Sequence, residues 1–246
     1  MMKAIYPSLK GKRVLVTGGG SGIGAGLVEA FRQQACDVCF FDVSAESRAV
    51  ADATGATFIR TDLRDISATK AAIDRLIADG GPINVLVNNA ANDDRHAIAD
   101  VTEEYWDDRI GVNLKHLFFC AQAVAPDMRA SGGGSIINLG SISWHLALPD
   151  LVLYQTAKAA IEGMTRALAR DLGRDNIRVN CVVPGNVRTP RQLKWYTPEG
   201  EAEIVAAQCL DGRLAPEDIA AMVLFLASDD ARLMTGHEYF VDAGWR

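Results

Sequence analysis

Hydrophobic positions along the chain fall into short continuous runs separated by longer segments with helical periodicity. The short runs are apolar at consecutive positions rather than at every second one, which is typical of strands buried on both faces. Because helical segments separate the runs, the pattern predicts an α/β fold: a single Rossmann-type, doubly wound parallel sheet of about seven strands with helices on both faces. The expected strands are Arg13–Thr17, Asp37–Asp42, Thr57–Thr61, Ile83–Asn88, Ser135–Leu139, Ile177–Val183 and Glu238–Val241.

The chain of 246 residues contains no internal repeat, low-complexity tract or proline-rich linker that would divide it. We therefore predict one domain over residues 1–246. One region departs from the alternation of strands and helices, because residues 189–212 carry two prolines, Trp195, Tyr196 and a charged helical stretch. We expect this region to form a substrate loop or lid.

Composition and charge exclude several classes of protein. Hydrophobic residues make up 49% and charged residues 23%, which excludes intrinsic disorder. Thirty-one acidic against 25 basic side chains, with no basic run, argue against nucleic acid as a partner. No apolar stretch has the ~20 residues of a membrane span, and no signal peptide is recognisable at Met1, so we expect no membrane association and a cytoplasmic location.

Cysteine and histidine usage points the same way. The five cysteines are odd in number and scattered, which favours reduced thiols over a disulfide framework. Cys36 and Cys39 have the spacing of a metal motif, but Cys39 lies in an expected buried strand and no second pair follows. Since the four histidines are also dispersed, we predict no metal site.

A glycine-rich segment, residues 18–24, follows the first expected strand directly and opens into an amphipathic helical stretch. A strand, a glycine turn and a helix start, in that order, let backbone N–H groups and the positive end of the helix contact a pyrophosphate. Asp42 ends the second strand about twenty residues on, where a carboxylate accepts hydrogen bonds from both ribose hydroxyls of an adenosine. The same charge repels a 2′-phosphate, so the sequence favours NAD over NADP.

Tyr154 and Lys158 lie four residues apart on an expected helix, so their side chains share one face. An ammonium within ~4 Å of a phenol, at an effective dielectric of ~20, is worth about 4 kcal/mol, enough to lower a pKa from ~10 to ~7. We therefore expect Lys158 to lower the pKa of Tyr154 and Tyr154 to act as a general base. Ser141 follows the fifth strand at the sheet edge where doubly wound folds bind ligands, and its hydroxyl can polarise a substrate oxygen.

In order and spacing these motifs resemble the short-chain dehydrogenase/reductase family, and the resemblance covers the chain nearly end to end. It implies hydride transfer between a substrate carbon and a nicotinamide, coupled to proton transfer through Tyr154, with Lys158 also binding the cofactor ribose. Asn113, inside a helix, would position a water, and the C-terminal Trp245 and Arg246 would support a homotetramer or reach the site of a neighbouring subunit. Ala91 departs from the pattern, because the family usually has Gly there. The cofactor-binding positions implied by the resemblance are Gly18, Ser21, Gly22, Ile23, Gly24, Asp42, Asp62, Leu63, Asn89, Ala90, Tyr154, Lys158, Pro184, Gly185, Val187 and Thr189.

Runs outside the shared motifs, such as 92–96, 142–145 and 194–202, are similar to those of one subfamily, the bacterial NAD-dependent D-xylose 1-dehydrogenases. This implies oxidation at C1 of a cyclic aldose, D-xylose or a similar sugar, to a lactone. The residues expected around the substrate, 92–96, 143–145 and 192–196, are polar and aromatic, which also suits a small polyhydroxylated ligand better than a sterol. An NADPH-dependent 3-oxoacyl-thioester reductase, or another short-chain alcohol dehydrogenase, remains the alternative. The residues expected to contact the sugar are Asn92, Ser141, Ser143, His145, Tyr154, Asn186 and Trp195.

Overall fold

The computed structural model describes residues 4–194 and 196–245. Seven parallel strands form one sheet in the order β3-β2-β1-β4-β5-β6-β7, which confirms the expected fold class. Each expected run is a strand, and β4 begins two residues later than predicted. The strands are β1 (Arg13–Thr17), β2 (Asp37–Asp42), β3 (Thr57–Arg60), β4 (Val85–Asn88), β5 (Gly134–Leu139), β6 (Ile177–Pro184) and β7 (Glu238–Val241).

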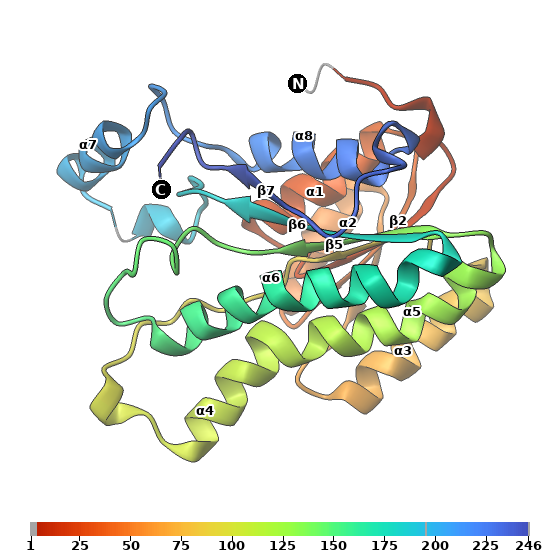
Figure 1. Ribbon diagram of the computed structural model, residues 1–246, viewed down its shortest axis with the longest axis horizontal. Coiled ribbons are helices and arrows are strands. Elements are labelled where there is room, and N and C mark those ends of the chain that lie inside the picture. Colours follow the sequence, from red (N-terminus) through yellow and green to blue (C-terminus); the bar gives the residue numbers. More distant parts are fainter. Residues whose placement is uncertain (1–3, 195, 246) are drawn as a thin grey trace.

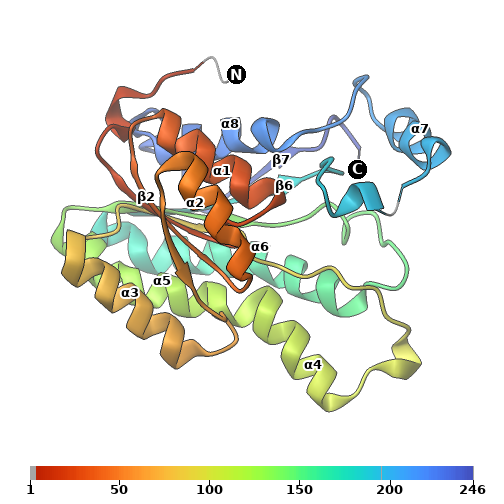
Figure 2. The same ribbon diagram turned by 180° about the vertical axis from the view of Figure 1, so that it is seen from behind.

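Helices cover both faces of this sheet. Figure 1 shows α1, α2 and α8 on one side and α3, α5 and α6 on the other, and Figure 2 shows the same layers from behind. The helix α4 leads into α5, whereas α7 lies apart from both layers (Figure 1). The bounds are α1 (Gly22–Gln33), α2 (Arg48–Thr54), α3 (Ile66–Gly80), α4 (Glu103–Ile110), α5 (His116–Ala130), α6 (Val152–Leu172), α7 (Pro198–Ala207) and α8 (Pro216–Ala227).

The continuous apolar runs are explained by burial on both sides of the sheet. Along β1, Val14 and Val16 belong to the core under α1 and α8, while Leu15 between them belongs to the core under α3 and α5. The strand β2 behaves in the same way, with Phe40 on one side and Phe41 on the other. A strand with no solvent-facing side needs apolar residues at every position, which is the pattern the sequence shows.

The strand order reverses between β1 and β4, where the chain has crossed from one half of the sheet to the other. Such a switch point leaves a crevice at the carboxyl ends of the strands, because the connections on its two sides turn away in opposite directions. The segments that follow β1, β4, β5 and β6 all emerge at this edge. No helix in the described part of the chain is long and apolar enough to cross a membrane.

Candidate active site

The glycine segment after β1 forms a cradle into which no side chain would fit. A Cβ built on Gly24 would lie 1.8 Å from the carbonyl oxygen of Gly18, and one on Gly20 would lie 1.9 Å from Oγ of Ser47. Gly18 and Gly22 also have positive φ, +67° and +52°, which glycine adopts without strain. Backbone therefore lines this surface, as close approach by a pyrophosphate requires.

Helix α1 begins immediately beyond this cradle. The N-cap residue Ser21 has an extended backbone, and the Ser21 side chain accepts no hydrogen bond from the first turn of the helix. The backbone N–H groups at the start of α1 are therefore not capped by Ser21. Ile23 instead packs against the hydrophobic core and anchors the turn. An anion at this end is favoured by the helix dipole, so the cradle and α1 together fit a dinucleotide phosphate.

Asp42, at the end of β2, lies beside the same cradle. Its Oδ2 accepts a hydrogen bond from the backbone N–H of Gly20 at 2.9 Å, and its Oδ1 accepts one from Ser44 at 3.0 Å. The carboxylate is thus held in place by backbone N–H groups, and each oxygen retains further acceptor capacity. The expected role of Asp42 toward an adenosine ribose stays a prediction.

Residues at the ends of β3 and β4 complete the expected cofactor side. Asp62 accepts hydrogen bonds from the Arg64 guanidinium, which lowers the pKa of the Asp62 carboxyl, and Leu63 is buried. Asn89 donates from Nδ2 to the carbonyl oxygens of Thr17 and Gly18, both at 3.0 Å. The backbone N–H of Ala90 donates to Oγ1 of Thr17 at 3.1 Å, so the ends of β1 and β4 are tied together at the switch point.

Tyr154, Lys158 and Ser141 are brought together at the carboxyl edge of β5. Tyr154 and Lys158 lie on one face of α6, with the ammonium nitrogen 5.4 Å from the centroid of the phenol ring. Ser141, in the loop after β5, is hydrogen-bonded to the Tyr154 phenol. The Nζ atom of Lys158 donates to the carbonyl oxygen of Leu139 at 2.7 Å, so the ammonium is anchored on the strand that carries Ser141.

The expected effect of Lys158 on Tyr154 does not hold in this arrangement. Burial raises the pKa of the Tyr154 phenol, the negative charge of Asp93 raises it further, and the hydrogen bond with Ser141 lowers it only in part. Burial also lowers the pKa of Lys158 to about 8. The expectation from the spacing was wrong because it neglected the loss of hydration that both groups undergo on burial.

Asn113 lies in a π-helical turn, Gly111–Lys115, between α4 and α5, rather than in a regular α-helix. Its Oδ1 accepts from the backbone N–H of Asn92 at 2.7 Å, and its Nδ2 donates to the carbonyl oxygen of Asn92 at 2.9 Å. The buried amide therefore fixes the loop after β4. Asn92 itself has its side chain at the rim, where Oδ1 accepts from the backbone N–H of Asp94 at 2.9 Å.

That loop is joined to the segment after β6 by ion pairs. Arg191 contacts Asp93 at 2.9 Å and Asp94 at 2.7 Å, and Gln192 donates to Asp93 at 3.3 Å. Arg109 of α4 holds Asp94 from the other side at 3.2 Å. Segments almost a hundred residues apart in the sequence thus meet beside Tyr154, and we call this group of Asp93, Asp94 and Arg191 the latch.

The remaining predicted sugar contacts differ in their surroundings. Ser143 is buried, and its Oγ has no hydrogen-bond partner among the described residues, whereas its backbone N–H donates to Oγ of Ser141 at 3.1 Å. His145 is held by Glu162 of α6 at 3.1 Å. Asn186 donates to the hydroxyl of Tyr196 at 2.7 Å. Trp195 lies outside the described residues.

The segment after β6 carries the last group of expected cofactor positions. Pro184 ends β6, and the backbone N–H of Gly185 donates to Val241 of β7 at 2.8 Å. Val187 is buried and forms an isolated bridge with Leu214. Thr189 lies against the glycine cradle, because a Cβ on Gly22 would be 3.2 Å from its Cγ2. From there the chain passes through the short turn Gln192–Lys194 to α7, so the expected lid region begins beside the cradle.

Three side chains near this centre were not identified from the sequence as parts of a site: Arg191, Arg109 and Glu162. The arginines carry no local signal, because their acidic partners come from distant segments. Glu162 had one available signal, since it follows Lys158 by four residues as Lys158 follows Tyr154.

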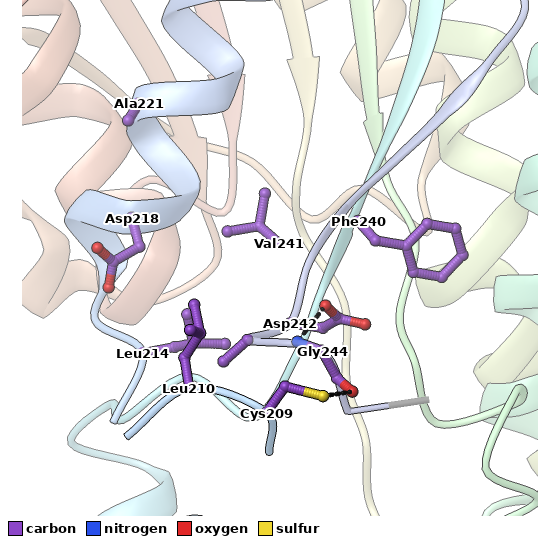
Figure 3. Close-up of a pocket in the computed structure, with 10 residues that line it drawn as sticks. Cys209, Leu210, Leu214, Asp218, Ala221, Phe240, Val241, Asp242 and Gly244 are labelled. Carbon is purple, nitrogen blue, oxygen red and sulfur yellow. Dashed lines mark hydrogen bonds between the residues drawn. The ribbon is translucent and has the colours of Figure 1, made fainter. Parts of the chain in front are cut away.

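A separate hollow lies at the far side of the lid region (Figure 3). Residues of β7 and the chain after it line this hollow, together with Cys209, Leu210, Leu214, and Asp218 and Ala221 of α8. Figure 3 shows Oδ1 of Asp242 accepting from the backbone N–H of Gly244, at 2.9 Å, and Cys209 donating to the carbonyl oxygen of Gly244. Neither Ser141 nor the Tyr154 face of α6 lines it, so the chemistry described above is not located there.

The chain is similar to known enzymes over its whole length. A family profile described as enoyl-(acyl carrier protein) reductase matches residues 18–246. The D-xylose 1-dehydrogenase of Caulobacter vibrioides (strain NA1000 / CB15N) is 65% identical over 100% of both chains. The "Probable galactose dehydrogenase GalD" of Rhizobium meliloti (strain 1021) is 50% identical over 97% of this chain and 96% of that protein.

Solved structures give the same picture. The aldohexose dehydrogenase of Thermoplasma acidophilum, in ligand-free form, superposes with a TM-score of 0.88 at 28% identity. The match covers 98% of this chain and 96% of that chain. The similarity therefore includes the sheet, the cradle and the segments that carry Ser141, Tyr154 and Lys158.

Proposed function

The chain belongs to the short-chain dehydrogenase/reductase family, and from that premise we propose that it is an NAD-dependent aldose 1-dehydrogenase acting on D-xylose or a similar sugar. It is an oxidoreductase of the nicotinamide-dependent class. The observation that carries the chemistry is the grouping of Ser141, Tyr154 and the buried Lys158 at the same edge of the sheet as the glycine cradle. The choice of an aldose rests on the relatives named as D-xylose and galactose dehydrogenases.

The residues of the cradle fit the cofactor. Gly18 to Gly24 offer backbone to the pyrophosphate, Asp42 the acceptor for the adenosine ribose, and Asp62 and Leu63 the surface beside the adenine. When bound, the oxidised nicotinamide supplies an acceptor for the hydride that leaves C1 of the sugar. We assign NAD rather than NADP because Asp42 repels a 2′-phosphate and Val43 and Ser44, not a cation, follow it.

Protein side chains handle the proton. Oxidation of a cyclic aldose removes a hydride from C1 and a proton from the C1 hydroxyl, which leaves a C=O next to the ring oxygen, a lactone. Tyr154, as the phenolate, accepts that proton, and Ser141 donates a hydrogen bond to the reacting oxygen. Lys158, whose nitrogen lies 5.4 Å from the centroid of the phenol ring, would bind the ribose of the cofactor, and its charge does not by itself offset the effect of burial on the pKa of Tyr154.

The loop after β4 and the lid region, residues 189–212, surround the sugar. Asn113 holds the backbone of Asn92, and the latch connects this loop to the lid next to Tyr154. Asn92, His145 and Asn186 offer hydrogen-bonding groups for sugar hydroxyls, and Ser143 supports Ser141 through its backbone. Closure of such a lid excludes water while the hydride is transferred.

Two further expectations belong to this proposal. All five cysteines are free thiols and four of them are buried, which supports a reducing compartment such as the cytoplasm. The family resemblance favours a homotetramer, to which Trp245 contributes. Trp245 is partly buried and packs against the cluster that includes Leu117, Ile142 and Ile161, and Arg246 lies outside the described residues. Light scattering of the purified protein measures the number of subunits.

The function is tested by following NADH formation at 340 nm with a panel of pentoses, hexoses, simple secondary alcohols and acyl thioesters, each with NAD and with NADP. We expect oxidation of D-xylose or a related aldose, with NAD as the better cofactor. Activity confined to acyl thioesters with the phosphorylated cofactor would replace this proposal with a 3-oxoacyl-thioester reductase and leave the family unchanged.

A further inference from the structure

Glu162 is a buried carboxylate that takes no part in the chemistry described above. It lies on α6 four residues after Lys158 and eight after Tyr154, so the three side chains occupy the same face of the helix. The Glu162 side chain is 10% exposed. A buried carboxylate is costly unless hydrogen bonds compensate for its lost hydration, so its partners show what it organises.

Both side-chain partners of Glu162 come from the loop that carries Ser141. Its Oε1 accepts from Nε1 of Trp144 at 2.8 Å and from Nε2 of His145 at 3.1 Å. The Trp144 and His145 rings lie against each other with centroids 3.8 Å apart, and Phe240 of β7 contacts the His145 ring edge-on at 4.9 Å. Hydrogen bonds to an ionised acceptor are stronger than neutral ones, so this carboxylate clamps two neighbouring residues of the loop.

The carboxylate also lies directly against the backbone next to Ser141. A Cβ built on Gly140 would be 3.5 Å from Oε1 of Glu162 and 3.0 Å from Sγ of Cys181. Gly140 stands between Leu139, whose carbonyl oxygen accepts from Lys158, and Ser141. Glu162 and Lys158 therefore hold the end of β5 and the start of the loop from the same face of α6.

We propose that Glu162 is a positioning residue for the reaction, holding residues 141–145 on α6 through Trp144 and His145 and so fixing the Ser141 hydroxyl relative to Tyr154. The proposal rests on the proposed function, since the position of Ser141 affects catalysis only if the reaction takes place at Tyr154. Glu162 acts through the loop and contacts neither sugar nor nicotinamide. Displacement of a polarising group by about 1 Å reduces turnover roughly 100-fold, which sets the size of the expected effect.

Two substitutions separate the hydrogen bonds from the charge. Glu162→Gln keeps an oxygen that can accept hydrogen bonds from both Trp144 and His145 and removes the charge, whereas Glu162→Leu keeps the approximate volume and removes both hydrogen bonds. We expect Glu162→Leu to lower kcat roughly 100-fold with little change in the affinity for NAD. Glu162→Gln should recover most of that loss, and Asp171→Asn, which removes an exposed carboxylate from the same helix, should match the wild type.

A second readout does not depend on activity. In ¹⁵N-labelled protein, the NMR signal of the Trp144 indole N–H can be identified as the one that disappears in Trp144→Phe. This N–H should be protected from hydrogen exchange in the wild type and in Glu162→Gln. It should exchange rapidly in Glu162→Leu. If thermal unfolding or NAD binding shows that Glu162→Leu does not fold, Trp144→Phe removes one of the two hydrogen bonds from the loop side, leaves His145 in place, and should show a smaller loss of kcat in the same direction.

The outcomes separate the two proposals. A wild type that oxidises no aldose would refute the proposed substrate class, and the variants would then be compared on whichever alcohol the enzyme oxidises. Turnover of Glu162→Leu within twofold of an active wild type, or an indole N–H equally protected in that variant, would overturn the role of Glu162 and leave the aldose dehydrogenase proposal intact. Equal losses in Glu162→Leu and Glu162→Gln would overturn it as well, because the hydrogen bonds would then not be what matters.

Discussion

Replacing Arg191 by Gln should weaken the binding of the sugar without weakening the chemistry. Arg191 is the basic member of the latch, with Asp93 at 2.9 Å and Asp94 at 2.7 Å, and it belongs to the lid region. Both aspartates follow β4, and Arg109 of α4 fixes Asp94 independently. Loss of Arg191 therefore releases the lid while the loop after β4 keeps its other support.

The magnitude follows from the exposure of the three side chains. Arg191 is 49% exposed, Asp93 33% and Asp94 51%, so both contacts are screened by solvent. Ion pairs of this kind contribute about 0.5 kcal/mol each, or about 1 kcal/mol for two. If the sugar binds to the latched form, this difference corresponds to roughly a fivefold increase in KM. Because the charge of Arg191 lowers the pKa of Tyr154, its loss offsets part of any gain in kcat from faster opening of the lid, so kcat should change little.

Steady-state kinetics at several salt concentrations measure this effect. The KM of the wild type for its sugar should rise with ionic strength toward that of Arg191→Gln, whereas the KM of the variant should respond less, because added salt screens the same contacts. Arg170 is an exposed arginine in the last turn of α6, so Arg170→Gln serves as the control for a change in net charge. A KM that is unaltered in Arg191→Gln, or an equal salt response in both proteins, would show that the latch does not govern binding.

Three other predictions concern the proton, the cofactor and acid stability. Tyr154→Phe should bind NAD as the wild type does, measured by quenching of protein fluorescence, and lose roughly 100- to 10,000-fold in kcat. Because burial raises the pKa of Tyr154, kcat/KM of the wild type should rise with pH from neutral into the alkaline range. A pH-independent profile would argue against Tyr154 as the base. Asp42→Ala should raise the ratio of kcat/KM for NADP to that for NAD roughly 10- to 100-fold, because a like-charge contact with the 2′-phosphate disappears; an unchanged ratio would remove Asp42 from cofactor selection. Burial lowers the pKa of His116 from 6.5 to about 4, so the folded protein favours the neutral form and the unfolded chain takes up a proton first as the pH falls below ~6.5. The free energy of unfolding should therefore decrease by about 2 kcal/mol between pH 7 and pH 5. His116→Gln, which can still donate to the carbonyl oxygen of Ala90, should show a smaller loss in urea unfolding at the two pH values.

The strands and the cofactor cradle are determined largely by local sequence. A strand buried on both faces must be apolar at consecutive positions, so Arg13–Thr17 and Asp37–Asp42 are recognisable without knowledge of their neighbours. The glycine turn is equally local, because the close approach between Gly24 and Gly18 excludes any other side chain. Tyr154 and Lys158 share a helix, and the spacing alone places them on one face.

The electrostatics and the walls of the site depended on the tertiary structure. Whether Lys158 acidifies Tyr154 depends on burial and on Asp93, neither of which is encoded in the four-residue spacing, and the pKa of the phenol is raised where the spacing alone predicted a decrease. The latch joins residues almost a hundred positions apart, and Glu162 acquires its partners only when the loop after β5 folds back on α6. Hydrophobic periodicity and glycine turns are properties of neighbouring residues, so the sequence displays them directly. Charge, hydration and long-range pairing are properties of the space between segments, and only the folded chain defines that space.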